Sequence, residues 1–143
     1  MGRRRRTVVT DGVPFASLLL DSGAVLAVAR NGHTVQGWLA QARMHGVEPR
    51  VTLVTVAEVF RDRRDGARVQ WVLSRLEHEP LTLAHAHDAG RLLGATESAD
   101  HTIDALVAAT AVRLPRPVIV LTSDPKDLER LLEGQRRITV VAV

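Results

Sequence analysis

Cysteine and tyrosine are absent from this 143-residue chain, and aromatic residues make up only 3% of it. Without cysteine there is no disulfide framework, no thiolate zinc site and no cysteine nucleophile, which excludes several classes of enzyme. With only two phenylalanines and two tryptophans, recognition of nucleic-acid bases by aromatic stacking is expected to be weak. Trp38 and Trp71 recur at helical spacing with other apolar residues, so both are predicted to lie in the core.

Long hydrophobic runs and phosphate-binding glycine loops are also missing. No stretch reaches the roughly 20 uninterrupted apolar residues of a membrane span, and Arg3 to Arg6 are not followed by the apolar segment of a secretory signal. We therefore expect a soluble, cytoplasmic protein without a membrane partner. The nucleotide-binding folds that depend on a glycine-rich loop are disfavoured.

Length and charge indicate one domain. A chain of this size with 45% apolar residues can bury one core, which we assign to residues 15–143, with residues 1–14 as a basic and flexible leader. Arginine supplies every basic residue except Lys126, and guanidinium groups suit phosphate contacts. The net charge is nevertheless only +3, so a nucleic-acid partner is compatible with the composition without being demanded by it.

Apolar runs alternate with helical patterns along the chain. Strands are predicted at 17–20, 51–54, 81–84, 118–121 and 138–143; helices are predicted at 24–29, 35–42, 67–78, 87–95 and 100–112, with others containing Glu58 and opening at Asp124. This alternation predicts an α/β domain of three layers, in which helices flank a mostly parallel sheet of four to five strands. Ligands of such sheets bind outside the carboxyl ends of the strands, where the strand order reverses.

Four carboxylates, Asp21, Glu58, Asp104 and Asp124, are placed to meet in one acidic pocket at that edge. Two carboxylates about 4 Å apart repel by about 4 kcal/mol at an effective dielectric constant of about 20. Protons or cations must neutralise such a cluster, and a divalent metal ion is the natural ligand.

Helix capping offers a structural alternative for three of the four. Asp21 and Asp124 stand where N-cap residues belong, and Glu58 could close a capping box with Thr55. Asp104 has no such explanation, because it lies within an Ala-rich helix and shares a face with apolar residues such as Val107 and Ala111. Burying an unpaired carboxylate costs several kcal/mol or more, so Asp104 decides in favour of a functional pocket.

The histidines show no comparable pattern. His85 and His87 would share one face of the predicted 81–84 strand and its extension, but no third partner has zinc-ligand spacing, so both are predicted to lie at the surface. The remaining four, His33, His45, His78 and His101, form no recognisable constellation, which disfavours a histidine-based hydrolase.

Four segments together resemble the PIN-domain ribonucleases, in particular the VapC-like toxins of bacterial VapBC toxin-antitoxin pairs. They are Leu18–Ala24, Val54–Arg61, Asp104–Ala111 and Val120–Leu128. The resemblance implies a PIN-like fold and an endoribonuclease in which Asp21, Glu58, Asp104 and Asp124 hold Mg²⁺ or Mn²⁺ and activate a water that hydrolyses the RNA phosphodiester. It further implies a homodimer and an antitoxin protein partner.

Two positions bear on how fully the family's site residues apply to this chain. Asp127 matches a frequent acidic position of the family and would be a supporting or capping residue. Many relatives carry a hydroxyl or amide residue two positions after the first aspartate, where this chain has Gly23, so Ser22 or Ser123 would have to supply the polar contact. Arg61 is a candidate for holding the RNA backbone.

Other functions stay open at this point. A housekeeping RNA-processing nuclease and a non-catalytic interaction domain that binds a basic peptide both fit an acidic pocket. A receiver-like or phosphoryl-handling domain would need a second aspartate beside Asp21 or a lysine after a late strand, and Gly23 and Lys126 fit neither requirement.

Overall fold

A computed structural model describes residues 8–10, 13–97 and 100–143 of the chain, and of residues 8–10, 13 and 14 it describes the backbone alone. Within the predicted leader, β1 (Val8–Thr10) and β2 (Val13–Phe15) pair as an antiparallel ribbon. Arg3 to Arg6 lie outside the described residues, so the flexibility of the leader stays a prediction. None of the helices in the described ranges combines the length and apolarity needed to cross a membrane.

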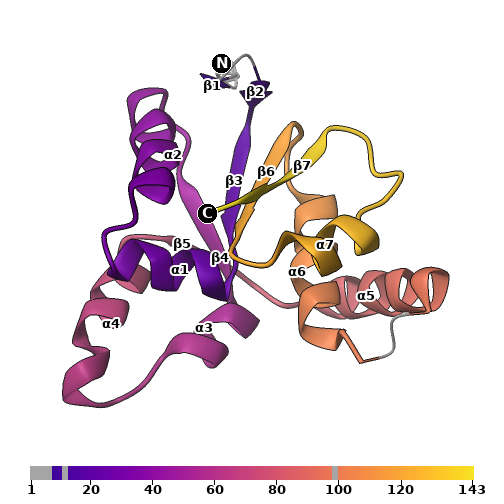
Figure 1. Ribbon diagram of the computed structural model, residues 1–143. Helices are drawn as coiled ribbons and strands as arrows, with labels where there is room; N and C mark the ends of the chain where they lie inside the picture. The colour runs from indigo at the N-terminus through magenta and orange to yellow at the C-terminus, as the bar shows by residue number, and fades with distance from the viewer. Residues whose placement is uncertain (1–7, 11–12, 98–99) are drawn as a thin grey trace, which may run out of the picture.

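The main sheet has five parallel strands in the order β5-β4-β3-β6-β7 (Figure 1). The strands are β3 (Ser17–Leu20), β4 (Pro49–Thr52), β5 (Glu77–Glu79), β6 (Val118–Thr122) and β7 (Ile138–Ala142). This arrangement confirms the predicted parallel α/β architecture, including the last strand at the edge of the sheet.

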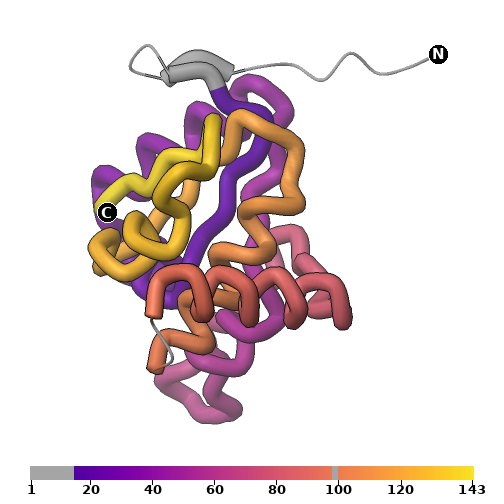
Figure 2. The backbone as a smooth tube through the Cα atoms, turned by 90° about the vertical axis from the view of Figure 1, so that its right-hand side faces the viewer, coloured from indigo at the N-terminus to yellow at the C-terminus, as the bar shows by residue number. Residues whose placement is uncertain are grey.

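Helices cover both faces of the sheet. They are α1 (Ser22–Ala29), α2 (His33–Met44), α3 (Leu53–Val59), α4 (Ala67–Ser74), α5 (Leu83–Thr96), α6 (Thr102–Arg113) and α7 (Pro125–Leu131), with a 3₁₀ turn at Arg64–Gly66. Figure 1 shows α1, α2 and α4 on one side and α5, α6 and α7 on the other; Figure 2, turned onto the second side, shows α5 crossing in front of the sheet.

The central strand β3 divides the core between these two layers. Successive side chains of a strand point to opposite faces, so Leu18 and Leu20 pack with the α1, α2 and α4 side while Leu19 packs with the α6 and α7 side. All three leucines are completely buried. A strand that is apolar on both faces belongs in the middle of a parallel sheet, and β3 places the residue that follows it, Asp21, at the centre of the carboxyl edge.

Two predicted strands are corrected by capping residues. The predicted strand at 81–84 is wrong: β5 precedes it, and Thr82 caps α5, accepting a hydrogen bond from the His85 backbone while His85 Nδ1 accepts one from the Thr82 backbone N–H at 3.2 Å. The predicted strand at 51–54 lies two residues too late, because Thr52 ends β4 and caps α3. Short apolar runs fit a strand or a buried helix equally well, and the cap decides between them.

Several aromatic and histidine predictions also change. Trp71 is 52% exposed, with the Arg68 guanidinium carbon 4.7 Å from its ring centroid, so its assignment to the core is wrong. Trp38 is half-buried and packs on Phe15 at a centroid distance of 5.8 Å. His85 is buried as part of the α5 cap and is not a surface residue, whereas His87 is exposed as predicted.

Candidate active site

The candidate site lies at the carboxyl edge of β3, β4 and β6. From β3 the chain builds β4 and β5 on one side of the sheet and then returns to build β6 and β7 on the other, so the strand order reverses beside β3. Open parallel sheets bind their ligands at this kind of position. Asp21 follows β3, and its backbone N–H donates to the Leu121 carbonyl of β6 at 3.0 Å, which joins the two strand ends.

Asp21 combines the capping role and the site position that the sequence left as alternatives. Its Oδ1 accepts a hydrogen bond from the Ala24 backbone N–H at 3.0 Å, and its Oδ2 accepts one from the Thr122 hydroxyl. Partial burial raises the pKa of the Asp21 carboxyl and the charge of Asp104 adds to that rise, whereas these two hydrogen bonds and one from the Gly23 backbone N–H oppose it. Asp21 is therefore fixed in position and lies within electrostatic reach of Asp104.

Glu58 is released from the capping role that the sequence allowed. The N-cap of α3 is Thr52, whose hydroxyl accepts from the Thr55 backbone N–H at 3.0 Å and donates to the Thr55 hydroxyl at 3.0 Å. Glu58 lies a turn later and is half-buried. Partial burial raises the pKa of its carboxyl, and the charges of Asp104 and Asp21 raise it further.

Asp104 sits differently from the prediction. Helix α6 begins at Thr102, so Asp104 belongs to its first turn, and its side chain is 37% exposed where the sequence indicated a core-facing position. The burial cost argued from sequence is therefore smaller than expected, and a carboxylate in a first turn is favoured by the helix dipole. The pKa of Asp104 is nevertheless raised, by partial burial first and then by Asp127, against the opposing charge and hydrogen bond of His101.

Asp124 stands at the N-cap position of α7 without capping it. Its side chain accepts no helix-capping hydrogen bond, and Pro125 occupies the first helical position. Its backbone N–H donates to the Thr122 hydroxyl oxygen at 3.0 Å, so Thr122 connects the Asp124 turn to Asp21. Asp124 is exposed, and its charge contributes to the raised pKa of Asp104.

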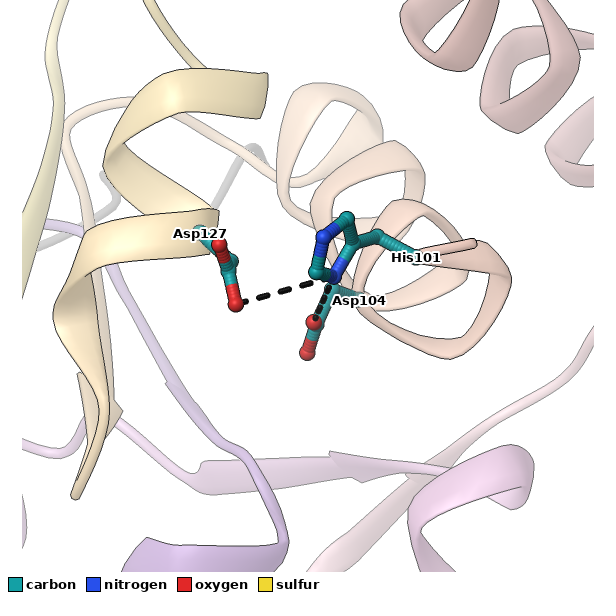
Figure 3. Close-up of side chains that lie close together, drawn as sticks. All are labelled: His101, Asp104 and Asp127. Atoms are coloured by element: carbon teal, nitrogen blue, oxygen red, sulfur yellow. Dashed lines mark ion pairs between the residues drawn. The ribbon is translucent and has the colours of Figure 1, made fainter. Parts of the chain in front are cut away.

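A tighter group lies beside this set, formed by His101, Asp104 and Asp127 (Figure 3). His101 Nδ1 is 3.5 Å from Asp104 Oδ2 and 3.6 Å from Asp127 Oδ2. His101 is the N-cap residue of α6, Asp104 lies in the first turn of α6 and Asp127 lies in α7. Each offers one ligand atom, and these atoms are all within 4.8 Å of one another. Carboxylate oxygens suit Mg²⁺ and Mn²⁺, and the imidazole nitrogen suits softer divalent metals, so the donor chemistry fits a divalent cation.

His101 was not predicted from the sequence to be a site residue. The available signal was its spacing of three residues from Asp104 at a helix start, which puts both on one face. Of the four predicted carboxylates, only Asp104 belongs to the group with ligand atoms within 4.8 Å, as judged over residues 8–10, 13–97 and 100–143. The other three lie within electrostatic reach of Asp104: its charge raises the pKa values of Asp21 and Glu58, and the charge of Asp124 raises the pKa of Asp104.

Comparison with known proteins places the fold. No known family model matches the sequence, and neither does any curated protein. Three solved structures that match are VapBC2 from Rickettsia felis bound to a DNA fragment from their promoter, a toxin-antitoxin complex from Klebsiella pneumoniae and VapBC-5 from Mycobacterium tuberculosis.

These matches are structural and extend over most of each chain. The R. felis chain has a TM-score of 0.71 at 14% identity, covering 89% of this chain and 98% of that one. The K. pneumoniae chain has a TM-score of 0.64 at 17% identity, covering 85% of this chain and 94% of that one. The M. tuberculosis chain has a TM-score of 0.57 at 21% identity, covering 90% of this chain and 99% of that one. The protein therefore has the three-layer, VapC-like PIN fold that its sequence motifs predicted.

Proposed function

We propose that this protein is a metal-dependent endoribonuclease and the toxin of a VapBC-type toxin-antitoxin pair. One observation carries the proposal: at the carboxyl edge of the sheet, partial burial raises the pKa values of Asp21, Glu58 and Asp104, which come from three separate elements, and the charge of Asp104 raises those of Asp21 and Glu58 further. Carboxyl groups with raised pKa values in one site are typical of catalytic or cation-binding centres. The fold shared with chains of toxin-antitoxin complexes supports the same conclusion.

Mg²⁺ or Mn²⁺ is the proposed cofactor. Asp104, Asp127 and His101 would hold the ion, with Asp21, Glu58 and Asp124 contributing negative charge around it. The bound ion would stabilise charge on the scissile phosphate and make a water molecule more acidic. Because Asp127 and His101 come from the geometry and the other residues from the sequence motifs, metal binding by each is tested separately below.

The side chains around the proposed ion have different proposed roles. Asp21 is held at both oxygens, which suits a residue that must keep a fixed position. The Glu58 carboxylate accepts no hydrogen bond within the described part of the chain, and its raised pKa suits it to orient the attacking water and accept its proton. Arg61 is exposed one turn beyond Glu58, and Arg63 and Arg64 follow it, so we propose that they contact the RNA backbone.

We propose that the antitoxin partner binds a groove formed by α1, α2, α4 and β4. The groove has a volume of about 740 Å³ and is lined by residues of α1, α2, α4 and β4. Trp71 presents an exposed ring there. The lining carries more positive than negative charge, because it includes three arginines, Arg43, Arg68 and Arg75, and one acidic residue, Glu48. We propose that an antitoxin segment with apolar and acidic side chains binds in this groove.

A homodimer is the proposed assembly of the toxin. Several large apolar side chains are exposed on the monomer, with Leu83 at 72% and Met44 at 74%. Light scattering of the full chain would test it, with Leu83→Glu and Met44→Glu as variants. A monomer at every concentration would contradict the assembly without touching the catalytic proposal.

The deciding experiment compares RNA cleavage by wild type, Asp104→Asn and Glu133→Gln in the presence of Mn²⁺. Glu133 is exposed in the turn after α7 and serves as the matched control for the loss of one carboxylate. We expect cleavage to disappear in Asp104→Asn, with folding intact by circular dichroism, and to persist in Glu133→Gln. Unaltered cleavage by Asp104→Asn rules out the nuclease mechanism, and a wild type that neither binds Mn²⁺ nor cleaves RNA favours the interaction domain.

A further inference from the structure

Gly23 and Ser123 share one space at the start of α1. A β-carbon placed on Gly23 would lie 1.9 Å from the Oγ of Ser123 and 2.7 Å from its Cβ. Such approaches are far inside van der Waals contact, so the Ser123 side chain occupies the volume that a side chain at position 23 would need. The glycine at the second position of α1 is thus required by a hydroxyl that comes from the turn after β6.

The position of that hydroxyl relates it to the acidic site. The backbone N–H of Gly23 hydrogen-bonds to the Asp21 carboxylate and lowers its pKa, so Ser123 approaches the chain at the residue that contacts Asp21. In sequence Ser123 stands between Thr122, which bonds to Asp21, and Asp124. Ser123 is therefore held against the first turn of the helix that Asp21 caps.

The two hydroxyls of this turn are used differently. The Thr122 hydroxyl is buried, donates to Asp21 and accepts from the Asp124 backbone. The Ser123 hydroxyl is exposed and makes no hydrogen bond to the residues that the structure describes. Among the described residues it is thus an unpaired donor, and it lies in the space beside Gly23, whose backbone N–H contacts Asp21.

We propose that Ser123 is a positioning residue of the candidate active site, whose hydroxyl hydrogen-bonds to a water in the hydration shell of the bound divalent cation. The proposal rests on the proposed function, because it presumes that the acidic site takes such a cation. Mg²⁺ and similar hard ions keep several of their waters in protein sites, and those waters are oriented by nearby polar side chains. Gly23 leaves the room that this contact needs.

Calorimetric titration of Mn²⁺ into the full-length protein tests the role without relying on activity. We expect Ser123→Ala to bind Mn²⁺ about fivefold more weakly, the loss of one hydrogen bond of ordinary strength. Its thermal unfolding without metal should match wild type, since the hydroxyl has no hydrogen-bond partner among the residues that the structure describes. Ser74→Ala, which removes another exposed hydroxyl on α4, is the control and should bind like wild type.

Three further variants separate positioning from packing. Gly23→Ser alone should unfold at a lower temperature, because its side chain collides with Ser123. The exchange variant, Gly23→Ser with Ser123→Gly, returns one hydroxyl to the same space and should recover both stability and Mn²⁺ affinity to within about twofold of wild type. Ser123→Thr keeps the hydroxyl and should also retain affinity.

The outcomes are distinguishable from those of the main proposal. Equal Mn²⁺ affinity for wild type and Ser123→Ala overturns the role of Ser123 and leaves the nuclease proposal standing. Weak binding by Ser123→Ala, Ser123→Thr and the exchange variant alike shows a packing role and also overturns it. A wild type that binds no Mn²⁺ overturns the cation site itself, a result that the Asp104→Asn cleavage experiment checks independently.

Discussion

Thr122 donates a hydrogen bond from its hydroxyl to Oδ2 of Asp21 across 101 positions of sequence. The same hydroxyl accepts from the Asp124 backbone N–H. This single buried side chain therefore ties the end of β6 to the end of β3 and fixes the distance between two residues of the candidate site. Hydrogen bonds to charged groups are the stronger ones in proteins, so the contact is expected to matter for stability as well as for geometry.

Replacing Thr122 by Val tests that contact. The change keeps the shape and leaves the Asp21 carboxylate without its side-chain donor, so we expect the free energy of unfolding at pH 7 to fall by about 1.5–3 kcal/mol, the range for hydrogen bonds to charged groups. Thr110→Val is the control, because Thr110 is also buried but donates to a neutral carbonyl, that of Leu106. Urea unfolding measures both; equal losses would contradict a special role for the Asp21 contact.

The acidic site should make the metal-free protein less stable as pH rises. Burial and neighbouring negative charges raise the pKa values of Asp21, Glu58 and Asp104, so the folded protein holds their protons more tightly than the unfolded chain. Stability from these groups is present below their unfolded pKa values, about 4, and is lost as pH rises through the raised folded values.

Asp104→Asn measures this effect through thermal unfolding without metal. We expect the variant to unfold at a higher temperature than wild type at pH 7, and the difference to shrink towards pH 4 as the wild-type carboxyls become protonated. Added Mn²⁺ should stabilise wild type at pH 7 and should do so less at acidic pH, because protons compete for the ligands. A variant that is less stable than wild type throughout this range would contradict the proposed repulsion.

The contribution of His101 and Asp127 to metal binding can be tested separately from that of the four carboxylates predicted from the sequence. His101→Ala and Asp127→Asn each remove one atom of the group with ligand atoms within 4.8 Å. If that group holds the ion, either change should weaken Mn²⁺ binding by about 10- to 100-fold, the usual effect of losing a ligand or a close supporting residue. Calorimetry measures the Mn²⁺ affinity of the two variants. Unchanged affinity in both would show that the ion binds at Asp21 and Glu58 instead.

Two glycines of the helical layers should respond in opposite directions to the same substitution. In Gly66→Ala the new methyl group would lie 2.2 Å from the Arg61 carbonyl oxygen, so we expect a clear loss of stability. In Gly90→Ala the methyl group meets nothing within 4 Å, and alanine in the middle of α5 should stabilise the fold by about 0.5–1 kcal/mol. Urea unfolding measures both, and a stabilising Gly66→Ala would show that the turn after α3 is placed differently.

Binding of the antitoxin in the groove can be tested at Trp71 and Arg68, which stack on each other at the surface and contribute little to the core. We expect Trp71→Ala and Arg68→Ala to change unfolding by about 0.5 kcal/mol or less, as for other surface sites. Binding of the co-expressed antitoxin should weaken by about 2 kcal/mol or more, because exposed tryptophan and arginine are typical interface hot spots. Arg136→Ala, exposed and outside the groove, is the control; equal affinity for all variants would place the antitoxin elsewhere.

The sequence by itself determined the architecture and named the four candidate carboxylates. Apolar runs such as those of β3 and β6 can be recognised in the sequence because a buried parallel strand needs apolar residues on both faces. Asp21 follows β3 directly, and Asp124 follows β6 after one residue, Ser123. Where a run was short, as at 81–84, periodicity could not separate strand from helix, and the threonine cap of α5 was the deciding feature.

Only the tertiary structure decided how those carboxylates are arranged. The sheet order brings β6 beside β3, and that order creates the bond between Thr122 and Asp21 and the close approach of Ser123 to Gly23. It also brings Asp127 of α7 to Asp104 and His101, which stand together at the start of α6. Local patterns encode which face of an element is apolar, whereas contacts between distant elements depend on how those elements pack, so no reading of the separate motifs could supply them.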